Sequence, residues 1–273
     1  MEKLIVMVAG LPGKMATLVA KAIATQEDMM LHTTGLSEES GCAIILSPFV
    51  PVELVPIASH KQVLSGSHCV DLIVDFTLPK SVNANARLYC EAGVPFVMGT
   101  TGGNREALVE TVKNSKISAV IAANMAVPVV IFQEMIRFAA ANFPHALDGF
   151  HLSIEESHQA SKKDVSGTAV SLLPLFAELG MPLAKGDIRM IRDPELQEQY
   201  LGVPKEYLGG HGFHTYEMLS PDDTVELGFI HNVLGRNVYV DGAMRAIRLL
   251  AEHRQERGKV FSMADVLRGS KQA

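Results

Sequence analysis

The sequence predicts an α/β fold in which an N-terminal domain with a parallel sheet precedes a central α+β domain with an open mixed or antiparallel sheet. Short, continuously apolar segments alternate with segments of helical periodicity up to about residue 125. This alternation is typical of parallel strands that are buried on both faces. Later segments alternate apolar and polar residues, as antiparallel strands do. The length of 273 residues suits one large domain or two modest ones.

Strands and helices are expected to alternate along the first half. Leu4–Ala9 is a continuously apolar segment of strand length, and the apolar residues of Lys14–Thr25 recur at helical spacing. Gly93 follows another expected helix directly and is a suitable C-cap. The remaining elements are strands at Met29–Thr34, Leu72–Phe76, Pro95–Met98 and Ala119–Ala123, and helices at Ser81–Ala92 and Glu106–Lys113.

The second half combines long helices with alternating strands. Helices are expected at Val129–Asn142, Thr168–Leu179 and Ala243–His253. Strands are expected at Phe150–Glu155, Gly212–Leu219, Thr224–Asn232 and Asn237–Val240, and Phe261–Leu267 closes the chain. No internal repeat or low-complexity linker separates the halves, so short hinges are expected between them.

Composition narrows the classes of function. The formal net charge is −6 and no segment is strongly basic, which argues against nucleic acid as a partner. A small anion remains possible, because a local cluster can be positive in an acidic protein. Cys42, Cys69 and Cys90 form no C-x-x-C pair, so neither a zinc site nor a redox pair is predicted and reduced thiols are expected.

The lengths of the apolar segments also indicate where in the cell the protein is expected. Leu4–Ala9 is too short for a signal peptide and is followed by glycine rather than by a cleavage site. No apolar stretch approaches the roughly 20 residues that span a bilayer. We therefore expect a cytoplasmic protein that does not cross a membrane.

A turn at Gly10–Ala16 follows the first strand and opens the first helix. Glycine suits a backbone that bends sharply and approaches a ligand, and the N–H groups at a helix start can hold a pyrophosphate. The spacing G-x-x-G-x-x-A lacks the full dinucleotide signature. An ordinary strand-to-helix turn capped by glycine is therefore an alternative, which the N-terminal position and the flanking β-α-β pattern disfavour.

Other strand ends carry small polar residues. His32–Ser37 contains no carboxylate where many dinucleotide sites place one. Since a carboxylate repels a 2′-phosphate, NADPH is favoured over NADH; the alternative is a second strand that simply ends in small polar residues. Asp75–Thr77, Gly99–Gly102 and Asn124 also follow strands, at the edge where parallel sheets bind ligands.

The densest polar segment is Glu155–Thr168. Ser166, Gly167 and Thr168 open a helix whose N–H groups can hold a carboxylate, and Lys162 adds positive charge. His158 titrates near neutral pH and can supply a proton. A solvated loop with an N-cap serine is the alternative. Glu155 and Glu156 are expected to be structural hydrogen-bond acceptors.

No metal site is predicted from the other histidines. His211, His214 and His231 lack the spacing of metal ligands, and His211 and His214 should lie on opposite faces of a strand.

The segment Glu156–Ala169, E-S-H-Q-A-S-K-K-D-V-S-G-T-A, resembles the motif E-x-H-H-x-x-K-x-D-A-P-S-G-T-A of the 4-hydroxy-tetrahydrodipicolinate reductases. The likeness extends over the whole chain in order. It includes the turn at Gly10–Ala16, Asp75–Thr77, Gly99–Gly102, Ala123–Met125, Asp241–Ala243 and Phe261–Leu267. The shorter loop, without the proline, is most similar to the plant and cyanobacterial branch.

The resemblance implies a fold and an activity. It implies a Rossmann-like domain at residues 1–126, a substrate and oligomerisation domain at 127–238, and a C-terminal helix and tail at 239–273 that return to the first domain. The reaction would be the NAD(P)H-dependent reduction of 4-hydroxy-tetrahydrodipicolinate to tetrahydrodipicolinate in lysine (diaminopimelate) biosynthesis. The partners would be a small dicarboxylate substrate and further copies of the chain, as a dimer or tetramer.

Residue roles follow from the same resemblance. His158 would be the general acid and Lys162 a second proton donor or carboxylate ligand. The substrate would contact Gln159, Ser166, Gly167 and Thr168. The cofactor would lie along Gly10, Gly13, Lys14, Met15, Thr77, Gly99, Thr101 and Asn124.

Two departures leave the exact substrate open. Gln159 stands where the family motif has a second histidine, and Ala16 stands where it has glycine. A related reductase of another imine or amino-acid-derived substrate would carry the same residues. A non-enzymatic dinucleotide-sensing protein is the third possibility, although such a protein needs no proton donor at His158.

Overall fold

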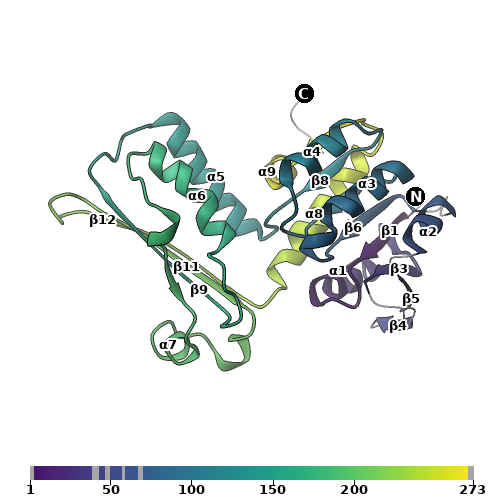
Figure 1. Cartoon of the computed structure of the whole chain (residues 1–273), viewed down its shortest axis with the longest axis horizontal. Coiled ribbons are helices and arrows are strands. Elements are labelled where there is room, and N and C mark those ends of the chain that lie inside the picture. Colours follow the sequence, from purple (N-terminus) through teal and green to yellow (C-terminus); the bar gives the residue numbers. More distant parts are fainter. Residues whose placement is uncertain (1–2, 39–42, 47–49, 57–58, 67–69, 270–273) are drawn as a thin grey trace. The chain divides into compact units, whose positions relative to one another are not determined.

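The computed structural model describes residues 3–38, 43–46, 50–56, 59–66 and 70–269. The chain forms two compact units. The first unit contains the residues up to Val127 and those from Tyr239 onward, and the second contains Pro128–Val238. The chain returns to the first unit through its last two helices (Figure 1). Cys90 is a free, partly buried thiol, whereas Cys42 and Cys69 lie outside the described residues.

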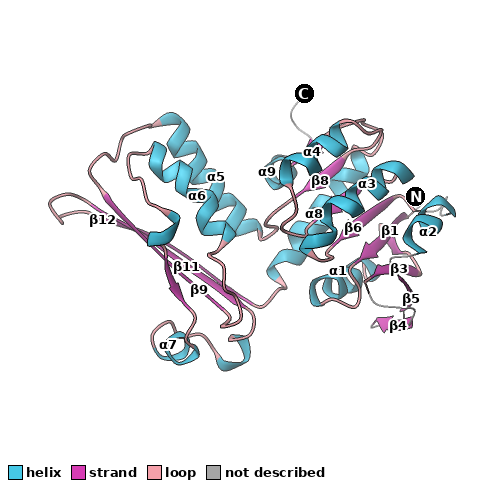
Figure 2. Cartoon of the chain, in the orientation of Figure 1, coloured by secondary structure: helices cyan, strands magenta, loops and turns pink. Residues whose placement is uncertain are grey.

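The first unit is built on a largely parallel sheet (Figure 2). Its described strands follow the order β13-β8-β7-β6-β1-β3-β5-β4, with β2 also paired to β1. Only the β4–β5 pairing is antiparallel among these described strands. The bounds are β1 Leu4–Ala9, β2 Met29–Leu31, β3 Thr34–Ser37, β4 Ala43–Leu46, β5 Val50–Pro56, β6 Leu72–Asp75, β7 Phe96–Met98, β8 Ala119–Ile121 and β13 Val260–Phe261.

Helices pack against this sheet through small and apolar side chains. The helices are α1 Lys14–Ala24, α2 His60–Gly66, α3 Val82–Ala92, α4 Arg105–Lys113, α8 Val238–Glu252 and α9 Met263–Arg268. The core on one side of the sheet includes Tyr89 of α3 against Phe96 and Met98 of β7, all fully buried. Gly93 ends α3 in the left-handed conformation at φ 74°, as the sequence predicts.

The second unit is a four-stranded sheet covered by helices. Its described strands follow the order β10-β9-β11-β12, antiparallel except for the β10–β9 pair. The strands are β9 His151–His158, β10 Arg189–Ile191, β11 His211–Leu219 and β12 Glu226–Leu234; the helices are α5 Val127–Asn142, α6 Gly167–Glu178 and α7 Pro194–Gln199. Figure 2 shows α5 and α6 along one face of this sheet, where their apolar side chains meet those of β9 and β11.

The register of this sheet gathers polar side chains on the covered face. Glu156 of β9 lies opposite His214 of β11, and His158 lies opposite Gly212. His214 in turn lies opposite His231 of β12. Because residues that face one another across antiparallel strands share a face, these side chains lie together at one end of the α5–α6 core.

The predicted fold class is confirmed, with local differences. The expected strand Met29–Thr34 is two strands, β2 and β3, and β9 continues to His158 rather than ending at Glu155. The expected strand Asn237–Val240 is wrong, because Val238 begins helix α8. Gly242 lets α8 approach the segment that follows β8, since a Cβ at this position would lie 1.9 Å from the carbonyl oxygen of Met125.

Candidate active site

The residues predicted to hold a dinucleotide gather at one edge of the first unit's sheet. The strands β8, β7, β6 and β1 are parallel neighbours in this order, so their carboxyl ends meet at the same edge. Gly10, Gly13, Lys14 and Met15 follow β1, Thr77 follows β6, Gly99 and Thr101 follow β7, and Asn124 follows β8. This is the edge at which open parallel sheets bind ligands.

The glycine turn has the shape of a phosphate-binding turn. Gly10 has φ 101°, and a Cβ there would lie 2.3 Å from the carbonyl oxygen of Phe76. A Cβ on Gly13 would lie 2.6 Å from the carbonyl oxygen of Gly10. Both positions therefore require glycine. Gly13 is the N-cap of α1 and no side chain caps the helix, so the turn fits a pyrophosphate at the helix start.

Asp75 organises the loops at this edge, a role that sequence reasoning did not assign. Its carboxylate is fully buried and accepts hydrogen bonds from the backbone and hydroxyl of Thr77 and from the hydroxyl of Thr100. Asn85 and the hydroxyl of Tyr89 donate to its other oxygen. Asp75 thus fixes the loops after β6 and β7 relative to each other.

The strand expected to end at Thr34 is followed by β3, so the strand end nearest the glycine turn lies later in the chain than the sequence predicts. Strand β3 continues to Ser37, and Gly10 donates its N–H to the carbonyl oxygen of Leu36. A carboxylate, Glu38, therefore follows directly after this strand. Its oxygen accepts a hydrogen bond from the hydroxyl of Ser81. The carboxylate at this strand end is consequently already bonded within the protein.

In the second unit, the buried carboxylate of Glu156 joins three partners. Its side chain is 0% exposed. Nδ1 of His158 lies 2.6 Å from one oxygen, and the Arg192 guanidinium donates to both oxygens, at 2.9 and 2.6 Å. The N–H of Ser166 donates to it at 3.2 Å. Burial alone would raise the pKa of Glu156, but the hydrogen bonds and charges of His158 and Arg192 prevail and lower this pKa to about 2.

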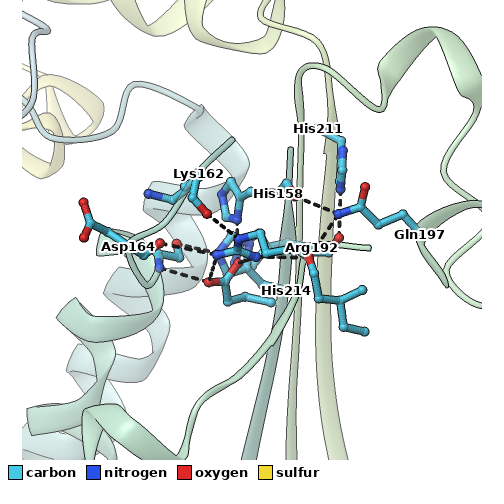
Figure 3. Close-up of polar contacts among 12 residues, drawn as sticks. His158, Lys162, Asp164, Arg192, Gln197, His211 and His214 are labelled. Carbon is cyan, nitrogen blue, oxygen red and sulfur yellow. Dashed lines mark hydrogen bonds and ion pairs between the residues drawn. The ribbon is translucent and has the colours of Figure 1, made fainter. Parts of the chain in front are cut away.

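Arg192 also secures the loop between β9 and α6 (Figure 3). Its Nε donates to the carbonyl oxygen of Lys162 at 2.8 Å, and one terminal nitrogen donates to that of Asp164 at 3.3 Å. No sequence pattern pointed to Arg192, which directly follows β10. Its guanidinium ties the position of Lys162 to the carboxylate that holds His158.

The neighbourhood of His158 fixes its ring. An ionised carboxylate can only accept hydrogen bonds. Nδ1 of His158 is therefore protonated and donates a hydrogen bond to Glu156. Nε2 lies above Gly212 of β11, where a Cβ would be 3.2 Å away. Gln197 of α7 donates to the carbonyl oxygen of His158 at 2.7 Å. The side chain is 17% exposed, so its Nε2 is the nitrogen left for chemistry.

The other predicted residues of this cluster lie beside His158 in the chain. Gln159 and Lys162 are partly buried, and the ammonium of Lys162 forms no hydrogen bond or ion pair with the described residues. Ser166 is the N-cap of α6, and Gly167 and Thr168 form its first turn. Contacts of the buried Glu156 with His158 and Ser166 join the two ends of this loop, whose residues 160–164 are largely exposed. Within the described part of the chain, no group of side chains is suited to hold a metal ion.

Across the described ranges, no helix combines the length and the apolar character needed to cross a bilayer.

The sequence is similar to one enzyme family along both units. The family model described as "Dihydrodipicolinate reductase, N-terminus" matches residues 4–125, and "Dihydrodipicolinate reductase, C-terminus" matches residues 128–267. The chloroplastic 4-hydroxy-tetrahydrodipicolinate reductase 1 of Arabidopsis thaliana is 41% identical over 274 residues, covering 96% of this chain and 77% of the relative.

More distant proteins show the same likeness. The 4-hydroxy-tetrahydrodipicolinate reductase of Desulfitobacterium hafniense (strain DSM 10664 / DCB-2) is 30% identical over 262 residues, with 91% of this chain and 94% of the relative covered. The solved structure of dipicolinate-bound dihydrodipicolinate reductase from Paenisporosarcina sp. TG-14 is similar in fold, with a TM-score of 0.66 and 20% identity over 96% of this chain and 98% of that one.

Two neighbouring arginines allow a matched test of the Glu156 ion pair. We expect Arg192→Met to lower the free energy of unfolding by about 3–5 kcal/mol, because it leaves a buried carboxylate without its main counter-charge. Arg189 pairs with the adjacent Glu155, but its side chain is 64% exposed. Arg189→Met should therefore cost less than about 1 kcal/mol. Denaturant titrations of the two variants check this, and equal losses would contradict it.

Proposed function

Because the chain belongs to the dihydrodipicolinate reductase family, we propose that it reduces 4-hydroxy-tetrahydrodipicolinate to tetrahydrodipicolinate in lysine (diaminopimelate) biosynthesis. It is an oxidoreductase that uses a nicotinamide dinucleotide. The observation that carries the assignment to this chain's own residues is the contact between Glu156 and Nδ1 of His158 beside the uncapped start of α6. A proton donor and a site for a carboxylate are thereby built into one buried cluster.

We assign the reaction to the following groups. The 4-hydroxyl leaves as water, and a reduced nicotinamide, when bound, would supply a hydride to the ring carbon that is then conjugated with the imine. His158, in its imidazolium form with both nitrogens protonated, donates the proton from Nε2 that completes the reduction. Glu156 stabilises the ring through Nδ1 before and after this transfer. Lys162 and the start of α6 hold a substrate carboxylate, since both present positive charge or N–H donors. Glu156 and Arg192 are positioning residues, because they act through His158 and through the loop that carries Lys162.

The cofactor is proposed to lie along the sheet edge of the first unit. The glycine turn and the start of α1 would hold its pyrophosphate, and the loops that Asp75 fixes would line its nicotinamide half. The proposed contacts are Gly10, Gly13, Lys14, Met15, Thr77, Gly99, Thr101 and Asn124.

The direct test of the reaction follows oxidation of NADPH and NADH with freshly generated hydroxy-tetrahydrodipicolinate. Turnover that depends on this substrate supports the proposal. A related reductase would instead oxidise the cofactor with another imine. A dinucleotide-sensing protein would bind the cofactor and turn over neither substrate.

The proposed catalytic pair can be tested by substitution. His158→Gln should lower turnover by about 10²–10⁴-fold, the usual contribution of general acid catalysis. Lys162→Ala should lower turnover and also weaken substrate binding, because a charge-assisted bond to a carboxylate is lost. Steady-state kinetics measure both effects. NADPH affinity should survive each change, since the phosphates are assigned to the Gly10–Ala16 turn.

Neighbouring residues supply controls for this experiment. Lys163 is exposed and adjacent to Lys162, and His151 is exposed at the other end of β9. Lys163→Ala and His151→Gln should leave turnover near that of the wild type. A folded His158→Gln variant with wild-type turnover at saturating cofactor would remove His158 from the mechanism.

For the cofactor, we expect NADPH to bind at least as tightly as NADH. Ser37 ends β3, and the carboxylate that follows, Glu38, is bonded to Ser81. A calorimetric titration of wild type and Glu38→Gln with both cofactors measures the preference. NADH binding about tenfold tighter to the wild type, and weakened in Glu38→Gln, would show that Glu38 holds the ribose hydroxyls and would contradict the expectation.

We also propose that the second unit assembles with further copies of the chain as a dimer or tetramer. Strand β12 lies at an edge of the described sheet, and Ile230 on it is 69% exposed. Beside it is a cavity of 420 Å³ lined by apolar side chains such as Phe132 and Phe229. Apolar edges of this kind need cover. Light scattering should report a dimer or tetramer, and a monomer at micromolar concentration would contradict the proposal.

A further inference from the structure

The hydroxyl of Ser166 is held away from the helix that it begins. Ser166 occupies the N-cap of α6, where a serine ordinarily accepts a hydrogen bond from the second or third N–H of the helix. Its side chain makes no such bond. Its Oγ lies instead 2.7 Å from Nε2 of His214 on β11, and both side chains are buried.

His214 is fixed in place by its neighbours on the sheet. The His231 ring stacks on it with centroids 4.5 Å apart, and the His158 ring meets it edge-on at 5.2 Å. Burial lowers the pKa of His214 to about 2, and the nearby His231 and His158 add to this effect. His214 is therefore a neutral imidazole and brings no charge to the cluster.

The neutral ring can carry its proton on either nitrogen. Nδ1 of His214 is buried and has no hydrogen-bond partner among the described residues. A buried N–H without an acceptor is rarer in proteins than a buried acceptor without a donor. The proton accordingly belongs on Nε2, which donates to Oγ of Ser166. The proton of the Ser166 hydroxyl can then point to a different acceptor.

We propose that His214 is a positioning residue that keeps the start of α6 open for a substrate carboxylate. By holding Oγ of Ser166, it prevents this hydroxyl from taking the N–H groups that an anion needs. It also makes the hydroxyl a donor toward the same anion. The inference rests on the proposed function, because it takes the substrate's carboxylate as the anion at α6.

Titration with dipicolinate, the dicarboxylate bound in the family member from Paenisporosarcina, tests this on the full chain at saturating NADPH. His214→Phe keeps an aromatic ring at this position but cannot hold Ser166, whose hydroxyl should then cap α6. The dissociation constant of dipicolinate should rise about tenfold or more, the range for a lost bond to a charged group. That of NADPH should change less than about twofold, as for independent sites.

Two further variants distinguish a positioning role of His214 from a role in packing alone. His214→Gln places an amide N–H near the position of Nε2, so it should restore most of the dipicolinate affinity. His231→Phe removes the stacked neighbour, which does not touch Ser166, and should leave dipicolinate affinity within about twofold of the wild type.

A double variant tests whether Ser166 and His214 act together. Ser166→Ala combined with His214→Phe should bind dipicolinate no more weakly than His214→Phe alone, because no hydroxyl remains to cap the helix. If the losses of the two single variants multiply, the residues act independently and the proposal is wrong. Wild-type affinity in His214→Phe would also overturn it. If that variant does not fold, the comparison of His214→Gln with Ser166→Ala replaces it. Dipicolinate affinity within about twofold of the wild type in His214→Gln and a clearly larger loss in Ser166→Ala support the proposal, and any other result overturns it.

The same measurements distinguish failure of the proposed reaction from failure of the proposed role of His214. A wild-type enzyme that binds dipicolinate but does not oxidise NADPH with hydroxy-tetrahydrodipicolinate refutes the proposed reaction and leaves the His214 comparison valid. A wild-type enzyme that binds no dicarboxylate overturns the role of His214 whatever its activity.

Discussion

The buried carboxylate of Glu156 is the group on which the polar cluster of the second unit depends. An isolated carboxylate without solvent contact would protonate, and it could then no longer accept from several donors. The guanidinium of Arg192 keeps Glu156 ionised by donating to both oxygens. The ionised group can therefore hold Nδ1 of His158 and the N–H of Ser166 together. One ion pair thus links the end of β9, the following loop and the start of α6.

Much of the fold could be predicted from the sequence, because buried parallel strands carry their signal locally. Leu4–Ala9 is a strand with the predicted bounds, and α3 ends at Gly93 as expected. The start of α8 was missed for a physical reason. Val238–Val240 has the β-branched composition of a strand, and Gly242 resembles a breaker. Its lack of a side chain is instead needed for the contact with Met125.

The site was predictable only where its residues are close in sequence. His158, Lys162 and Ser166 stand within one segment, and their residue types indicate a proton donor and an anion site. Arg192 and His214 come from later strands or their ends, and only the pairing of β9 with β10 and β11 brings them to Glu156. A local pattern does not encode strand register. The spacing of Glu156 and His158, two apart on a strand, was the one available signal of their shared face.

The proposed mechanism requires that Glu156 determines which nitrogen of the neutral His158 ring carries the proton. The most direct test is ¹⁵N NMR of the histidine rings, with the His158 signals assigned by their loss in His158→Gln. At alkaline pH, the wild type should show neutral His158 protonated on Nδ1. In Glu156→Gln, Arg192 should retain the amide oxygen, so that the amide N–H faces His158 and moves the proton to Nε2. The same tautomer in both proteins, or an Nε2 proton on the neutral ring of the wild type, would contradict this role of Glu156.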